Sequence, residues 1–133
     1  MAIAYDVEVE VAPPWLSLPL LGGVNVYWSP PSGPIVAPAI VYRPDQPWIE
    51  RQATYKVWRE LYVAVCVVPA SSGPDGVAKL YEMALTLKAA LDAPDAPAGW
   101  DWLGVGGIVE VDQAGLRYLA AAVRLSFNAE YDT

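Results

Sequence analysis

Few side chains in this sequence have the chemistry that an active site requires. The chain has no histidine and one cysteine, Cys66, which stands within the apolar run Val63–Val68. General acid–base catalysis most often uses histidine, and zinc sites are built largely from cysteine and histidine, so neither kind of site is expected. A thiol in such a run is typical of a buried, small apolar residue. We therefore predict no catalytic residue, no metal site and no cofactor, and we expect that the protein is not an enzyme.

Three polar motifs remain, and each has a simpler structural explanation. Asp6, Glu8 and Glu10 alternate with apolar residues, which is typical of the exposed face of a strand. Ser71–Ser72 has no accompanying base and precedes a helical pattern, so a helix cap is expected there. Gly104–Gly107 precedes a strand and not a helix, and it therefore lacks the context of a phosphate-binding loop.

Composition and charge indicate the class of partner. The net charge is −7 at pH 7, which argues against a protein that wraps nucleic acid through phosphate contacts. No run of about 20 apolar residues could span a membrane. Six tryptophans and eight tyrosines are more than one core needs, and aromatic residues are enriched at protein–protein interfaces. Trp100 and Trp102 could instead stack on a sugar or nucleobase, but we favour an interpretation in which they cover the end of a helix and a sheet.

The pattern of apolar residues predicts strands on both sides of one helix. The helix is expected at about residues 74–92, with a capping box formed by Ser72 and Asp75. Shorter strands are expected at 3–11, 24–28, 35–42 and 108–111, a turn-rich loop at 43–47 and a hairpin turn at 112–115. The apolar stripe of the helix consists of Val77, Leu80, Tyr81, Ala84, Leu87 and Leu91. This order favours an α+β class, with a mainly antiparallel sheet and the helix packed on one face.

Two predicted strands, Tyr55–Val68 and Leu116–Tyr131, are long for the size of the chain. They would span roughly 46 Å and roughly 50 Å, whereas a compact domain of this length is about 36 Å across. We therefore expect that they either bend sharply or project and pair with another molecule. In the first strand, Val63–Val68 should lie between two layers and Tyr55–Glu60 should be exposed. The second alternates, so its Tyr118, Arg124 and Ser126 side should face water or a partner. The chain is most simply one domain, 1–133, with an N-terminal strand and proline-rich extension (1–23) and an α+β core (24–131).

The order of several segments resembles a known family. These segments are Pro38–Ile49, Trp58–Val68, Ser71–Pro74, Trp100–Trp102 and Tyr118–Phe127. Together they resemble the tail terminator, or tail completion, proteins of long-tailed phages, notably phages of actinobacteria. The resemblance covers roughly residues 24–130 and concerns layout more than chemistry. Many relatives open with a helix, whereas this chain opens with a predicted strand.

The resemblance implies a virion structural protein that is assembled in the host cytoplasm. Six copies would form a ring that caps the tail tube, ends its polymerisation and joins the neck of the filled head. The partners would be other copies, the major tail tube protein and a head–tail connector protein, while DNA passes through the ring without specific binding. Members of the family have no catalytic residues.

Within such a ring, some aromatic and acidic residues are candidates for particular positions. Candidates for the interface between subunits or with the tail are Trp28, Trp48, Ile49, Arg51, Trp58 and Tyr62, although each aromatic residue could equally belong to the core. Candidates for an acidic lumen are Glu110, Asp112, Asp6, Glu8 and Glu10. Two alternatives remain open, namely another neck protein such as a stopper and, more distantly, a module that binds a carbohydrate or small ligand.

Overall fold

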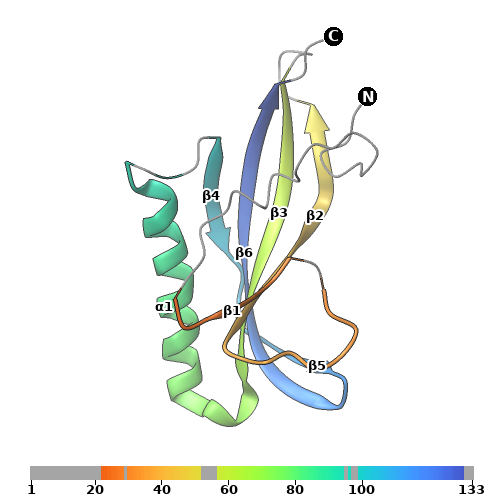
Figure 1. Cartoon of the computed structure of the whole chain (residues 1–133), viewed down its shortest axis with the longest axis vertical. Coiled ribbons are helices and arrows are strands. Elements are labelled where there is room, and N and C mark those ends of the chain that lie inside the picture. The colour runs from red at the N-terminus through yellow and green to blue at the C-terminus, as the bar shows by residue number, and fades with distance from the viewer. Residues whose placement is uncertain (1–21, 29, 52–56, 95, 97–98, 131–133) are drawn as a thin grey trace.

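A six-stranded sheet with one long helix against one of its faces forms the fold (Figure 1). The computed structural model describes residues 22–28, 30–51, 57–94, 96 and 99–130 of the 133-residue chain. The elements are β1 (Asn25–Tyr27), β2 (Ala39–Arg51), β3 (Val57–Pro69), a 3₁₀ turn (Ala70–Ser72), α1 (Gly73–Asp92), β4 (Trp100–Val105), β5 (Val109–Gln113) and β6 (Leu116–Glu130). The predicted α+β class with one helix on a mainly antiparallel sheet is confirmed.

The two long strands pair with each other. The strand order is β1-β2-β3-β6-β4, with β5 also paired to β6, and only β1 and β2 run parallel. β3 pairs with β6 from Val57↔Glu130 to Pro69↔Tyr118, β2 covers the other edge of β3, and β4 and β5 share the outer edge of β6. The expectation that the long strands must either bend sharply or pair outside the subunit therefore does not hold for the described residues, because β3 and β6 pair with each other along their length. It assumed a nearly spherical domain, whereas the molecule is elongated along its strands (Figure 1).

Side chains alternate between two apolar layers on the central strands. On the helix side, Tyr62, Ala64, Cys66 and Val68 of β3 join the main core beneath α1. On the other side, Val67 packs with residues of β2 and β6 under the segment that follows β1. The prediction that Val63–Val68 lies between two layers is confirmed, because all of these residues are buried except the half-buried Val65.

Two predictions of exposed strand faces are wrong at particular residues, namely Glu60 on β3 and Tyr118 and Ser126 on β6. Glu60 is 1 % exposed, and it lies opposite Phe127, which itself lies opposite Trp100 in β4. The hydroxyl of Tyr62 donates a hydrogen bond to the Glu60 carboxylate. On β6, Tyr118 and Ser126 are also buried, although their neighbour Arg124 is exposed. Alternation along one strand does not reveal that a distant segment covers its polar side.

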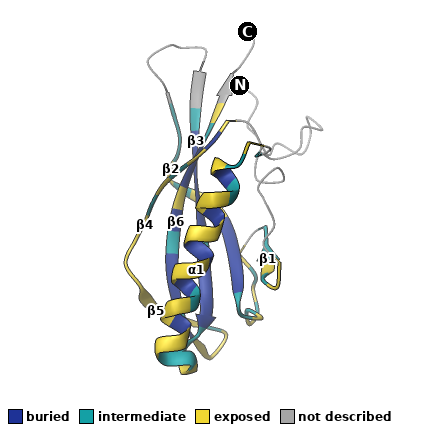
Figure 2. Cartoon of the chain, turned by 90° about the vertical axis from the view of Figure 1, so that its left-hand side faces the viewer, coloured by how far each residue is buried: buried dark blue, intermediate teal, exposed yellow. Residues whose placement is uncertain are grey.

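The helix has the predicted bounds but a rotated apolar face. Its buried residues are Gly76, Leu80, Met83, Ala84, Leu87 and Leu91. Val77 and Tyr81 were expected in the core, yet they are 42 % and 70 % exposed. Figure 2 shows this exposed outer side of α1 in front of the buried strands. The predicted capping box does not form, because Ser72 has helical backbone angles and makes no side-chain capping bond.

The connections also differ in part from expectation. Residues 43–47 do not form a loop, since β2 continues through them with a register shift between Pro44 and Ile49. The predicted hairpin turn does join β5 to β6. Its central residues, Ala114 and Gly115, both have positive φ, at 52° and 81°. Such angles are those of the two-residue turns that match the twist of a hairpin.

Candidate functional site

The residues predicted for an interface lie in different environments. Tyr62 is 0 % exposed and belongs to the main core, so its side chain is not available at the surface of the folded subunit. Trp28 stacks on Tyr42 with ring centroids 4.9 Å apart and packs against the same core. Trp48 also packs there, and Ile49 is half-buried. The side chains of the other two candidates, Arg51 and Trp58, lie outside the described part of the chain.

The candidates for an acidic lumen are only partly described. Glu110 and Asp112 are exposed on β5, and both lie beside Arg117 of β6. The guanidinium of Arg117 is 2.9 Å from a Glu110 oxygen and 3.6 Å from an Asp112 oxygen. One cation therefore offsets part of the charge of this pair. Asp6, Glu8 and Glu10 lie outside the described residues.

The two tryptophans on β4 do not present a pair of ring faces on which a sugar or nucleobase could stack. Trp100 is 5 % exposed and lies between the rings of Tyr62 and Phe127, with centroid distances of 5.6 Å and 5.0 Å. Its face is therefore not available to stack on a sugar. Trp102 is half-buried against the helix, and the Lys88 ammonium stands 5.9 Å from its ring centroid.

The described residues form no metal-binding cluster. Among them, no group of three or more Cys, Asp or Glu side chains is arranged to hold a metal ion. Burial raises the pKa of Cys66 to about 12, so the thiol stays protonated at neutral pH and is a poor nucleophile. Glu60 is the buried carboxylate that sequence reasoning missed, and no signal in its strand pattern separates it from an exposed position.

The first exposed apolar surface lies between the helix and the β4–β5 connection, and we call it the helix-side surface. Val77, Tyr81 and Leu85 contribute the exposed stripe of α1, while Val105 at the end of β4 and Ile108 in the connection line the same groove. They line a groove of about 370 Å³ whose lining is almost wholly apolar and includes Trp102. Gly106–Gly107 forms part of the wall, so a partner's backbone can approach closely there. Sequence reasoning placed Val77 and Tyr81 in the core and so missed this surface.

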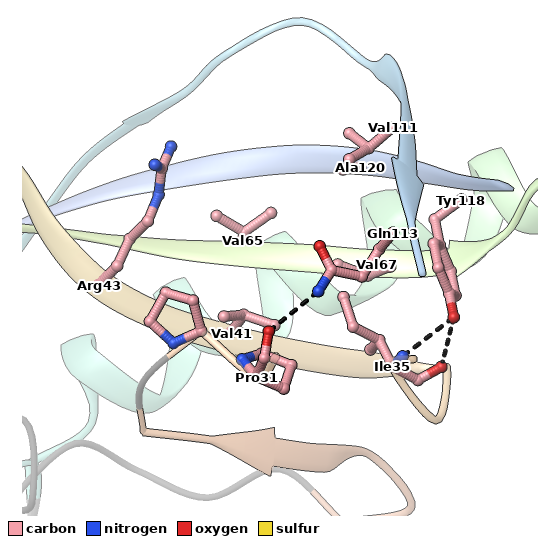
Figure 3. Close-up of a pocket in the computed structure, with 11 residues that line it drawn as sticks. Pro31, Ile35, Val41, Arg43, Val65, Val67, Val111, Gln113, Tyr118 and Ala120 are labelled. Carbon is pink, nitrogen blue, oxygen red and sulfur yellow. Dashed lines mark hydrogen bonds between the residues drawn. The ribbon is translucent and has the colours of Figure 1, made fainter. Parts of the chain in front are cut away.

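The second exposed apolar surface lies on the opposite face of the sheet, and we call it the hairpin-side surface. Val109, Val111 and Leu116 of the β5–β6 hairpin are 57 %, 37 % and 51 % exposed. Val111 lies opposite Tyr118, whose side chain packs in the second core layer and not beneath the helix. The surface continues into a pocket of about 260 Å³ with Val41, Val65 and Val67 in its lining (Figure 3).

Two polar side chains hold the wall of this pocket in place. The Tyr118 hydroxyl accepts a hydrogen bond from the Ile35 N–H at 3.0 Å and donates one to the Ile35 carbonyl at 2.9 Å. The Gln113 amide donates to the carbonyls of Pro31 and Gly33, at 2.9 Å and 3.0 Å. The segment that carries Pro30 and Pro31 is thereby fixed against β5 and β6 and walls the pocket (Figure 3).

Comparison with known proteins assigns no family. No protein-family model matches the chain, and no curated protein matches it significantly. In the part of the chain that the structure describes, no helix is both long enough and apolar enough to cross a bilayer.

Proposed function

We propose that this protein is a virion structural protein, the tail terminator of a long-tailed phage. In this role its copies form a ring, of six subunits by analogy with the family that the sequence resembles. The ring caps the tail tube, stops its polymerisation and joins the tail to the neck of the head. The assignment to the tail terminators rests on the resemblance in the order of segments described above. This role requires binding surfaces rather than catalytic groups.

Two apolar surfaces on opposite faces of one subunit are the observation that supports the proposed assembly. Contiguous apolar patches on a soluble protein mark sites of interaction. A twofold dimer needs a single self-complementary patch, whereas a ring joins two different patches head to tail. The helix-side surface and the hairpin-side surface provide such a pair. These two surfaces, and not the length of the strands, support the proposed assembly.

The charge of the chain is compatible with the passage of DNA. A net charge of −7 per subunit repels phosphate groups, so a ring of these subunits would not retain DNA by counterion release. Glu110 and Asp112 are the described candidates for the lumen, and their common partner Arg117 leaves a net charge of −1 at that position, from two carboxylates and one guanidinium.

The mass of the purified protein, measured by native mass spectrometry, tests the proposal directly. We expect a species of several subunits, and we expect it to bind tail tubes assembled from the major tail protein. A strictly monomeric protein that also fails to bind tail tubes would contradict the proposal.

Deletion of the gene then separates the terminator from a stopper. Loss of a terminator leaves filled heads and overlong tubes, whereas loss of a stopper leaves leaking heads beside normal tails.

A further inference from the structure

Arg43 lies beside the pocket on the hairpin-side surface and has no acidic partner among the described residues. It lies at one end of the pocket and its side chain extends away from β2 (Figure 3). Among the basic side chains that the structure describes, Arg59, Lys79, Lys88, Arg117 and Arg124 each have an acidic partner. Within the described part of the chain, the Arg43 guanidinium has neither an ion pair nor a hydrogen bond, which leaves a positive charge beside an apolar floor.

The pocket is suited to apolar side chains from an extended segment of protein. Its volume of about 260 Å³ lies below the roughly 300–1,000 Å³ of typical small-ligand sites. Its lining is mostly valine, alanine, isoleucine and proline, and the Gln113 amide nitrogen and the Tyr118 hydroxyl are already engaged by the pocket wall. A fitting occupant would therefore place a few aliphatic side chains on the floor and a carboxylate near Arg43.

One segment of this chain has that chemistry and lies outside the described residues. Residues 3–11 alternate between Ile3, Tyr5, Val7, Val9 and Val11 on one side and mainly acidic residues on the other. We propose that this segment of a neighbouring copy docks on the hairpin-side surface, with its apolar side in the pocket and its carboxylates within reach of Arg43. The inference rests on the proposed assembly of several copies.

The direction of the chain at its first described residues favours a neighbour's segment over the subunit's own. Val24 and Val26 pack against the main core on the helix side of the sheet, whereas the pocket opens on the other face. β1 runs parallel to β2 with Asn25 beside Ala39, so the chain enters β1 at the end of β2 that precedes Arg43. The ten residues from 12 to 21 can extend for about 33 Å, which is comparable with the roughly 36 Å width of a compact domain of this length.

Disulfide trapping in the full-length chain tests this contact. Val111 lines the pocket and is accessible, and the native Cys66 is buried, so a new cysteine at either site reacts selectively. We would mix a Val111→Cys variant with a Val7→Cys or Val9→Cys variant and oxidise the mixture. We expect disulfide-linked dimers in the mixture and none from either variant alone. A chain that carries both cysteines should give a ladder of multimers.

Charge variants test the role of Arg43 and supply a matched control. Arg43→Glu should lower the yield of linked dimer by roughly fivefold or more, and Arg43→Gln by less. Lys79→Glu reverses one exposed charge on the helix, away from the pocket, and should leave the yield unchanged. Urea titration of each variant identifies any loss of yield that is caused by unfolding.

Three other results would each contradict the docking inference, and the last of them would also contradict the proposed function. A monomer with an internal disulfide from the double-cysteine chain would assign the pocket to the subunit's own segment. If the mixture gives no linked dimer while the wild-type protein has the mass of a ring, the docking inference fails and the proposed function stands. A wild-type protein that is monomeric would contradict both.

Discussion

Arg124 of β6 and Asp45 of β2 form an ion pair that spans the intervening strand β3, with 2.9 Å between Nε and Oδ2. The Asp45 side chain is 17 % exposed, and its other oxygen accepts the backbone N–H of Gln46 at 2.8 Å. The pair therefore ties the irregular part of β2 to β6. Val63 of β3, which pairs with both Arg43 and Arg124, is buried at this level of the sheet.

This geometry predicts unequal effects of removing the two partners. Arg124→Ala should lower the free energy of unfolding by about 0.2–1 kcal/mol, because the arginine is half exposed. Asp45→Ala should cost about 1 kcal/mol more, since it also removes the acceptor for Gln46. Urea denaturation of both variants measures the difference. An Asp45→Ala variant that is as stable as Arg124→Ala would show that the carboxylate does not hold the bulge.

The Tyr118 hydroxyl should contribute much more to stability than an exposed one. Tyr118→Phe leaves the N–H and carbonyl of Ile35 without their partner at a part-buried site, so we expect a loss of about 1–3 kcal/mol. Tyr81→Phe is the matched control, because Tyr81 is 70 % exposed, and it should change stability by less than about 0.5 kcal/mol. Equal losses from both variants, measured by thermal or urea unfolding, would contradict this account of the pocket wall.

The class of fold was predictable because it depends on local patterns. The helix bounds followed from the proline and glycine residues at its ends, and strand alternation identified the buried run Val63–Val68. The helix face was less predictable. A stripe at helical spacing includes residues on either side of its centre, and only the packing of α1 on β3, β4 and β6 decides that Met83 is buried and Tyr81 exposed.

The exposed apolar surfaces were not predictable for a related reason. Tyr62 and Tyr81 are both tyrosines in apolar patterns, yet one is in the core and the other lies on the outer side of the helix. The distinction depends on contacts between segments that are far apart in the sequence. The same is true of Arg43, because the acidic partners of Arg117 and Arg124 become visible only once the strands are paired.

Stability should decrease in alkaline solution because two ionisable groups are buried together. Burial raises the pKa of Cys66 from 9.0 to about 12, and burial together with the nearby Cys66 raises that of Tyr42. Above pH 9 the unfolded chain releases the thiol proton while the folded chain retains it. Each such group then lowers the free energy of unfolding by roughly 1.4 kcal/mol per pH unit, and the Cys66 contribution extends from about pH 9 to about pH 12.

Cys66→Ala isolates the contribution of the thiol. The variant loses some stability at pH 7 from the smaller side chain, but its free energy of unfolding should fall less steeply between pH 9 and pH 11 than that of the wild type. Urea titrations at a series of pH values measure both slopes. Parallel slopes would show that the thiol ionises in the folded protein as readily as in the unfolded chain.

The helix-side surface should be required for assembly and not for folding. Tyr81→Asp places a charge in the centre of the exposed apolar stripe, where burial against a neighbour would leave the charge without a partner. We expect the variant to keep the unfolding free energy of the wild type within about 0.5 kcal/mol and to dissociate into monomers at concentrations where the wild type is a ring. Native mass spectrometry at several concentrations measures the shift, which should be at least about tenfold in the dissociation constant.

Thr86→Asp introduces the same charge at another exposed position of α1, outside the groove, and should leave the assembly intact. If Tyr81→Asp retains the full mass, the helix-side surface does not join subunits, and a ring would have to be built from the hairpin-side surface and some other face.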